Sequence, residues 1–164
     1  MAFDAYLKID GIPGEALDSK HKDWIEITSY SFGVNQEVSE PASTAGGATA
    51  GRATFCDVYI KKNVDKASAK LFEQCARGVH IPKIVLHVNR AGGDQQKYIE
   101  ITLEQVLISS FKHDADTDSD LPSESFTLNY ARIKKAYTQQ KRSDGQGGGQ
   151  IAGGWDRTAN KTYA

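Results

Sequence analysis

The chain lacks the cysteine content of a metal-bound or disulfide-stabilised small domain. Its 164 residues include two cysteines, Cys56 and Cys75, which are far apart in sequence. A structural zinc site needs about four ligands and at least one close ligand pair, and no such pair is present. We therefore expect both cysteines to be buried free thiols.

The sequence also lacks a charge excess and any long apolar run. Its 20 Lys and Arg residues against 21 Asp and Glu residues give a net charge of −1. This balance disfavours a general nucleic-acid or membrane-surface binder, which would carry a basic excess. No signal-peptide pattern stands at the N-terminus, and no run approaches the length of a membrane span. We expect a protein made in the cytoplasm without membrane anchoring, which leaves the cell only through a dedicated machine.

Alternating apolar residues predict a mainly β protein. The predicted strands cover residues 6–9, 24–36, 53–61, 84–88, 98–111 and 124–137, in hairpin order without a βαβ repeat. One helix is expected between Asp65 as N-cap and Gly78 as C-terminal glycine. Its apolar stripe is Ala67, Leu71, Phe72, Cys75 and Ala76. The expected fold is an antiparallel β-barrel or sandwich with one flanking helix, in a single domain over residues 1–164.

The strand predicted over 24–36 changes its alternation part-way. Ile25 and Ile27 occupy odd positions, whereas Tyr30, Phe32 and Val34 occupy even ones. Both sets reach one core only if a β-bulge lies near Thr28 and Ser29. The residues that then face away from the core are small or polar, namely Ser31, Gly33 and Asn35.

Two segments read as connections because they lack apolar periodicity. Residues 37–52 form a long loop rich in Ser, Thr, Ala, Gly and Glu, and loops of this length usually have a function. Residues 143–154 are predicted to be a glycine-rich connector before a short segment anchored by Trp155.

No catalytic, metal or cofactor site is predicted. The stretch 46–54 has the two glycines of a phosphate-binding loop, but Arg52 and Ala53 replace its Lys and hydroxyl residue. The acidic run 114–120 resembles a calcium loop, but it lacks the turn glycine and the final Glu. The four histidines have no ligand spacing, and His87 is expected at the surface or between subunits. A solvated acidic loop and a small-residue loop are the simpler interpretations.

Several ordered segments resemble haemolysin-coregulated protein (Hcp), the tube protein family of type VI secretion. They are AYLKIDGIPGE at 5–15, HKDWIE at 21–26, YSFG at 30–33, YIEITL at 98–103, ESFTLNY at 124–130 and GW at 154–155. The resemblance implies a barrel similar to phage tail-tube proteins, six subunits in a ring, and rings stacked into a hollow tube inside a contractile sheath. It also implies spike and sheath partners, effector proteins in the lumen, secretion by the type VI system, and no enzymatic activity or cofactor.

The resemblance assigns expected roles to two sets of residues. Ser31, Gly33 and Asn35 would line the lumen. The loop 37–52 would contact a neighbouring subunit or the next ring through Glu40, Pro41, Ser43, Thr44, Gly46, Gly47, Thr49, Gly51 and Arg52. Two alternatives remain at this stage: a stand-alone oligomeric carrier for small secreted proteins, and an enzyme with an unrecognised site.

Overall fold

The computed structural model describes residues 2–38, 50–92, 95–141, 143 and 147–163. These residues form twelve strands and one helix. Their bounds are β1 Phe3–Ile9, β2 Ile25–Ile27, β3 Ser29–Ser31, β4 Val34–Asn35, β5 Thr54–Phe55, β6 Val58–Asn63, α1 Ser68–Arg77, β7 Ile81–Arg90, β8 Lys97–Asp114, β9 Ser123–Asn129, β10 Arg132–Gln140, β11 Gly147–Asp156 and β12 Lys161–Thr162. The prediction of a mainly β fold with one helix is confirmed.

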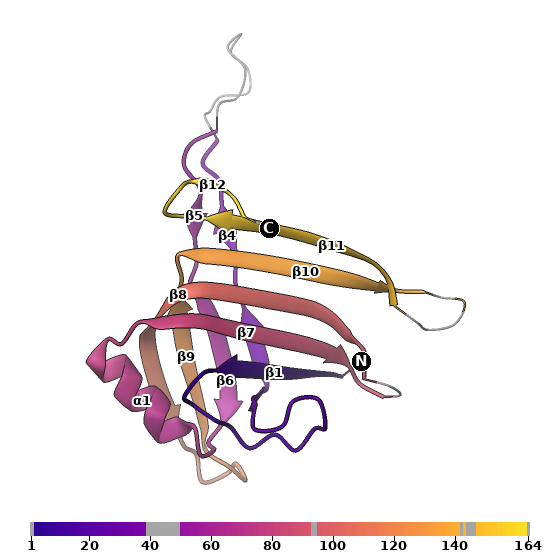
Figure 1. Cartoon of the computed structure of the whole chain (residues 1–164). Helices are drawn as coiled ribbons and strands as arrows, with labels where there is room; N and C mark the ends of the chain where they lie inside the picture. The colour runs from indigo at the N-terminus through magenta and orange to yellow at the C-terminus, as the bar shows by residue number, and fades with distance from the viewer. Residues whose placement is uncertain (1, 39–49, 93–94, 142, 144–146, 164) are drawn as a thin grey trace.

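Ten of these strands form two antiparallel sheets that share the long strand β8 (Figure 1), and β4 and β5 form a separate two-stranded ribbon. Sheet A has the order β12-β11-β10-β8-β7-β1-β2, and sheet B has the order β8-β9-β6-β3. The first part of β8 pairs with β7 and β10, and its last part, from Leu107, pairs with β9. Gln105 has a positive φ of 52° close to this change of partner. Among the described residues no strand pairing closes the sheets into a full barrel, so the sandwich form of the prediction applies.

The core fills the space between the two sheets. Strand β6 alternates buried and exposed side chains, and β9 alternates buried and half-buried ones, because each has one face on this core. In β1 the outward Tyr6 is also buried, with its ring stacked on His21. Leu7, Ile60, Ile84, Val106 and Leu128 are each almost fully buried in the core. One hydrophobic cluster therefore joins strands from both sheets.

Helix α1 lies at the side of the sheets (Figure 1) and confirms the prediction of one helix, whose apolar stripe and N-cap are corrected. Leu71 is buried and Gly78 adopts the left-handed conformation, with φ of 61°, that ends the helix. Phe72 is 62% exposed and Ala76 is also exposed, so the predicted apolar stripe is too wide. The helix covers the sheet with a narrow face, which leaves part of that stripe outside the contact.

The long strand predicted over 24–36 is instead three short strands. β2 pairs with β1 in sheet A, whereas β3 pairs with β6 in sheet B. At Thr28 the chain changes sheets, and the Thr28 N–H donates to Lys61 O at 2.8 Å. The switch in alternation thus reflects a change of sheet. Val34, predicted in the core, is 56% exposed because β4 pairs only with β5 in a separate ribbon.

Three further segment predictions are wrong. The strand predicted over 53–61 is split into β5 and β6, and the strand over 124–137 is split into β9 and β10 near Tyr130 and Ala131. Most of the glycine-rich connector predicted over 143–154 is strand β11, which pairs along β10. Backbone pairing with β10 stabilises this strand although its residues have low strand propensity. No helix in the described part of the chain has the length and apolar character needed to cross a membrane.

Candidate functional site

The described ends of the 37–52 loop form a paired ribbon that we call the stem, residues 34–38 and 50–55. β4 pairs with β5, Val38 bridges to Ala50, and the Gly51 N–H donates to Glu37 O at 2.8 Å. Two of the predicted contact residues, Gly51 and Arg52, lie in the stem and are exposed. Glu40, Pro41, Ser43, Thr44, Gly46, Gly47 and Thr49 lie outside the described residues. The stem leads into a strand rather than a helix, unlike a phosphate-binding loop.

The three predicted lumen residues lie on two different elements. Ser31 is at the end of β3 and exposed, Asn35 is exposed on β4, and half-buried Gly33 lies between them. Strand registry places Ser31 in one cross-strand row with Tyr59, Thr127 and Ser110. The structure therefore brings Ser31 onto a sheet surface that the sequence reasoning did not describe.

We call this surface the polar face of sheet B. A second row on it contains Ser29, Lys61, Ser125 and Lys112. Short hydrogen bonds tie the surface together. Ser109 Oγ donates to Asp57 Oδ2 at 2.6 Å and lies 2.7 Å from Thr127 Oγ1, and Asn129 Nδ2 donates to Asp57 Oδ1 at 2.9 Å. The alternating polar residues of 123–129 indicate an exposed strand face, but only strand pairing shows that this face adjoins Ser31.

Strand β11 has a largely open edge. β12 pairs only with Trp155 and Asp156, so residues 147–153 have no strand partner on that side among the described residues. Most of these residues are exposed and none is charged, and Ile151 is 76% exposed. An open, uncharged strand edge is a template for pairing with another chain.

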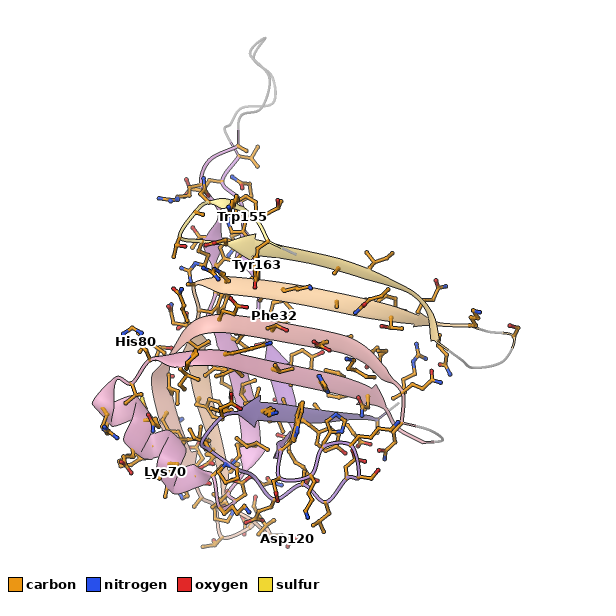
Figure 2. All side chains as sticks on the ribbon, viewed as in Figure 1. Phe32, Lys70, His80, Asp120, Trp155 and Tyr163 are labelled. Atoms are coloured by element: carbon orange, nitrogen blue, oxygen red, sulfur yellow. The ribbon has the colours of Figure 1, made fainter. Side chains whose placement is uncertain are left out.

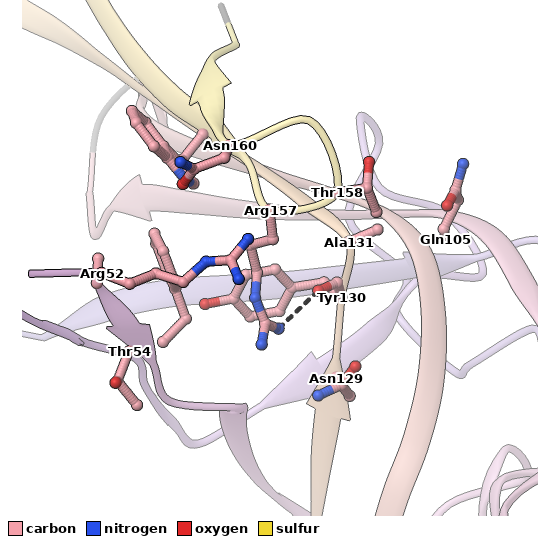
Figure 3. A pocket seen from close by; sticks show the side chains of 12 residues that line it. Arg52, Thr54, Gln105, Asn129, Tyr130, Ala131, Arg157, Thr158 and Asn160 are labelled. Carbon is pink, nitrogen blue, oxygen red and sulfur yellow. Dashed lines mark hydrogen bonds between the residues drawn. The ribbon is translucent and has the colours of Figure 1, made fainter.

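A cavity of about 560 Å³ lies where the stem meets the end of β11 (Figure 3). Arg52 of the stem and Arg157, just after β11, both line it. Arg157 Nη1 donates to Tyr130 O at 2.8 Å, and its guanidinium lies 5.4 Å from the Tyr130 ring centre. Burial raises the pKa of Tyr130 to about 12, so this phenol stays neutral and its hydroxyl donates to Cys56 O at 3.0 Å.

His87 belongs to a half-buried cluster rather than to an open surface. Its Nδ1 lies 3.0 Å from His21 Nε2, and its Nε2 lies 3.4 Å from Glu100 Oε2. His21 Nδ1 lies 2.6 Å from Asp18 Oδ2, and the Tyr6 ring stacks on His21 at 4.4 Å. Burial first, and then the charge of Lys97, lower the pKa of His87 to about 4. The cluster holds the segment before β2 against sheet A. His87 is half-buried rather than at an open surface, and its expected position between subunits stays a prediction.

A buried ion pair joins β6 to β9. Lys62 Nζ lies 2.5 Å from Glu124 Oε1, and both side chains are fully buried. Asp65 also accepts from Lys62, at 2.8 Å, and accepts the Ala67 N–H at 2.9 Å. Asp65 thus accepts a backbone hydrogen bond just before α1. The N-cap residue is Ala67, so the prediction of Asp65 as N-cap is corrected. No local pattern predicts this pair, since Lys62 and Glu124 are far apart along the chain and meet only as partners of paired strands.

The remaining candidate groups do not form a reaction site. Cys56 is exposed and Cys75 is half-buried, both as free thiols, so the prediction of two buried thiols is corrected. Within the described ranges, no three His, Cys, Asp or Glu side chains are arranged to hold a metal ion. In the acidic loop Asp116 Oδ1 accepts the Asp118 N–H at 3.0 Å, which folds the loop on itself.

Comparisons with known proteins identify the family. Residues 6–137 match the family model described as type VI secretion system effector, Hcp. The chain belongs to the Hcp family. It is 34% identical over 161 residues to protein hcp1 of Pseudomonas aeruginosa, which covers 98% of both chains. The family resemblance expected from the sequence segments is confirmed.

Solved structures agree with this assignment. The fold is similar to a structure described as a type six secretion system protein, with a TM-score of 0.92, 31% identity, and 99% and 100% of the two chains covered. It is also similar to the crystal structure of Hcp1 from Salmonella typhimurium, with a TM-score of 0.79, 30% identity and the same coverage. Hcp membership makes the chain a secreted structural component of type VI secretion rather than an enzyme.

Proposed function

We propose that this Hcp-family chain is the subunit of a type VI secretion tube. Six copies form a ring, rings stack into a hollow tube that a contractile sheath ejects with its spike, and effector proteins travel in the lumen. The open edge of β11 is the observation that carries the proposal, because closing a ring of subunits would pair this edge. A ring contact is heterologous, so β11 needs a different complementary surface on the neighbouring copy.

The lumen assignment follows from the chemistry of the exposed surfaces. Ser31, Gly33 and Asn35 remain the proposed lumen residues, and we extend the assignment to the polar face of sheet B that adjoins Ser31. A surface of serine, threonine and lysine side chains, whose hydroxyl groups bond to one another, remains hydrated and offers few apolar contacts. Cargo on such a surface is held weakly and can be released.

The loop 37–52, carried by the stem, is proposed to contact a neighbouring subunit or the next ring. The stem, which includes the β4–β5 pair, extends away from the sheets (Figure 1). Backbone hydrogen bonds restrict the direction of a paired ribbon. It therefore holds its tip farther from the sheets than an unpaired loop of the same length would.

The ring is tested by sedimentation velocity and negative-stain microscopy of the purified chain. The expected result is one species with six times the mass of the single chain, and hollow six-fold particles in projection. A monomer that persists from low to high micromolar concentration would contradict the ring.

A further inference from the structure

The cavity between the stem and the end of β11 holds two cationic side chains without an acidic partner. Arg52 forms no hydrogen bond or ion pair with another described residue, and Arg157 bonds only to neutral groups. Figure 3 shows both guanidinium groups directed into the same space. Two like charges that share one hollow repel each other, and an anion between them would remove this cost.

Two acids next to cavity-lining residues are already engaged. Asp57 accepts from Ser109 and Asn129, and Asp156 accepts from Arg132 and Thr158. Neither carboxylate has an ion pair with Arg52 or Arg157 among the described residues. Guanidinium groups bind carboxylates through two parallel hydrogen bonds, so the cavity matches a carboxylate supplied from outside the chain.

The opposite end of the molecule presents carboxylates. Strand β8 ends at Asp114, and the loop to β9 carries Asp116, Asp118 and Asp120. Figure 2 shows Asp120 at the lower end of the molecule and Trp155, which lines the cavity, near the upper end. Lys112 pairs with Asp114, whereas Asp118 and Asp120 have no cationic partner in the described part of the chain.

We propose that the arginine cavity binds aspartate side chains of the 115–122 loop of a second copy of this chain. This inference rests on the proposed function and names the contact between stacked rings: the cavity end of one ring faces the acidic end of the next. The charges are complementary between unlike ends and repulsive between like ends, so they set a single polarity for the stack. The contact is exposed, so added salt weakens it.

Charge reversal tests the contact. Arg52→Glu changes a side chain that bonds to no described residue, and the double variant Asp118→Lys/Asp120→Lys changes two exposed acids. Each variant alone is expected to form rings that no longer stack at low salt. A mixture of the two variants is expected to regain stacks because the reversed charges match again. Lys22→Glu, at an exposed cation outside both surfaces, is the control and is expected to stack like the unmodified chain.

Ring size and stack length are both read by sedimentation and negative-stain microscopy across a salt series. If Arg52→Glu stacks as well as the unmodified chain, or if the mixture does not regain stacks, the cavity contact is overturned. Intact rings in these experiments leave the proposed function standing. Unmodified rings that do not associate at low salt also overturn the contact. Absence of rings in the unmodified chain overturns the proposed function itself.

Discussion

His87 shows how one residue couples this fold to pH. Its neighbours are Tyr6 of β1, His21 and Trp24 of the segment before β2, and Lys97 and Glu100 of β8, while Asp18 bonds to His21. Burial lowers the pKa of His87 from 6.5 to about 4, so the folded chain keeps this ring neutral where the unfolded chain protonates it. The unfolded state thus binds more protons between these values, and stability decreases as pH falls from about 6.5 to about 4.

Replacing His87 with glutamine is expected to remove this contribution. The free energy of unfolding of the unmodified chain should decrease between pH 7 and pH 5, and the decrease should be smaller in His87→Gln. Urea titrations at fixed protein concentration measure both slopes. The pKa of Asp18 is lowered mainly by the hydrogen bond from His21, and Lys97 lowers the pKa of Glu100 against the effect of burial. The stability that these two carboxylates contribute is therefore lost only at more acidic pH.

His113→Gln provides the matched control, because His113 is exposed near the end of β8 and has no partner in this cluster. Its slope should equal that of the unmodified chain. Equal slopes in His87→Gln and the unmodified chain would instead show that another group produces the pH dependence.

At the scale of the element, β11 shows a strand that depends on its neighbours rather than on its own residues. Gly154 packs so closely that an added Cβ would lie 1.9 Å from Tyr163 O and 2.6 Å from Ile133 O. The Tyr163 N–H donates to Gly154 O at 3.0 Å, and the Tyr163 hydroxyl donates to Glu104 Oε1 at 2.6 Å. Glycine at 154 is therefore required for β12 and Tyr163 to close over the end of β11.

Gly154→Ala is expected to lower the free energy of unfolding by about 2 kcal/mol, as overpacking does in a well-filled interior. The neighbouring Gly153→Ala is the control, since its Cβ meets nothing within 4 Å. It should change stability by no more than about 0.5 kcal/mol, in the stabilising direction, because alanine restricts the unfolded chain. Urea unfolding of both variants measures the difference. Equal effects would show that the Gly154 contact relaxes without cost.

The elements that the sequence predicted well are those with a side-chain pattern. β1, β7, β8 and β9 alternate apolar and polar residues, and α1 has helical spacing and a terminal glycine, so local reasoning placed them. β11 was predicted as a connector because glycine carries no pattern, and its strand exists only through pairing with β10. Similarly, Thr28 was read as a bulge because the change of sheet depends on pairing with Lys61.

The candidate surfaces divide in the same way. Ser31 was predicted to face outward from local alternation, and it is exposed, whereas its role in a lumen stays a prediction. In the sequence, Arg52 stands where a phosphate-binding loop has lysine. Its proximity to Arg157 arises only because the segments of β5, β9 and β11 meet in the fold. Contacts between residues far apart in sequence carry no local signal, so they appear only with the fold.

For the whole molecule, the open edge of β11 and the two differently charged ends are proposed to serve two kinds of association. β11 lies at the upper edge of sheet A, on the side of the stem and the arginine cavity, and the acidic loop lies toward the opposite end of the molecule (Figures 1 and 2). In the proposed assembly, pairing at β11 closes a ring, and contact between the arginine cavity and the acidic loop stacks rings. Variants of one contact should therefore leave the other intact, which separates ring formation from tube growth.

Ile151→Lys tests the lateral direction. Ile151 is 76% exposed on β11 and lies opposite the partly exposed Tyr137 of β10, so a charge there should disrupt a subunit contact without disturbing the core. The expected result is a folded monomer by sedimentation, with an unfolding profile that no longer depends on protein concentration. Leu17→Lys, at an aliphatic residue that is 90% exposed away from β11, should retain the ring. Rings formed equally by both variants would show that the side chain of Ile151 lies outside the lateral contact.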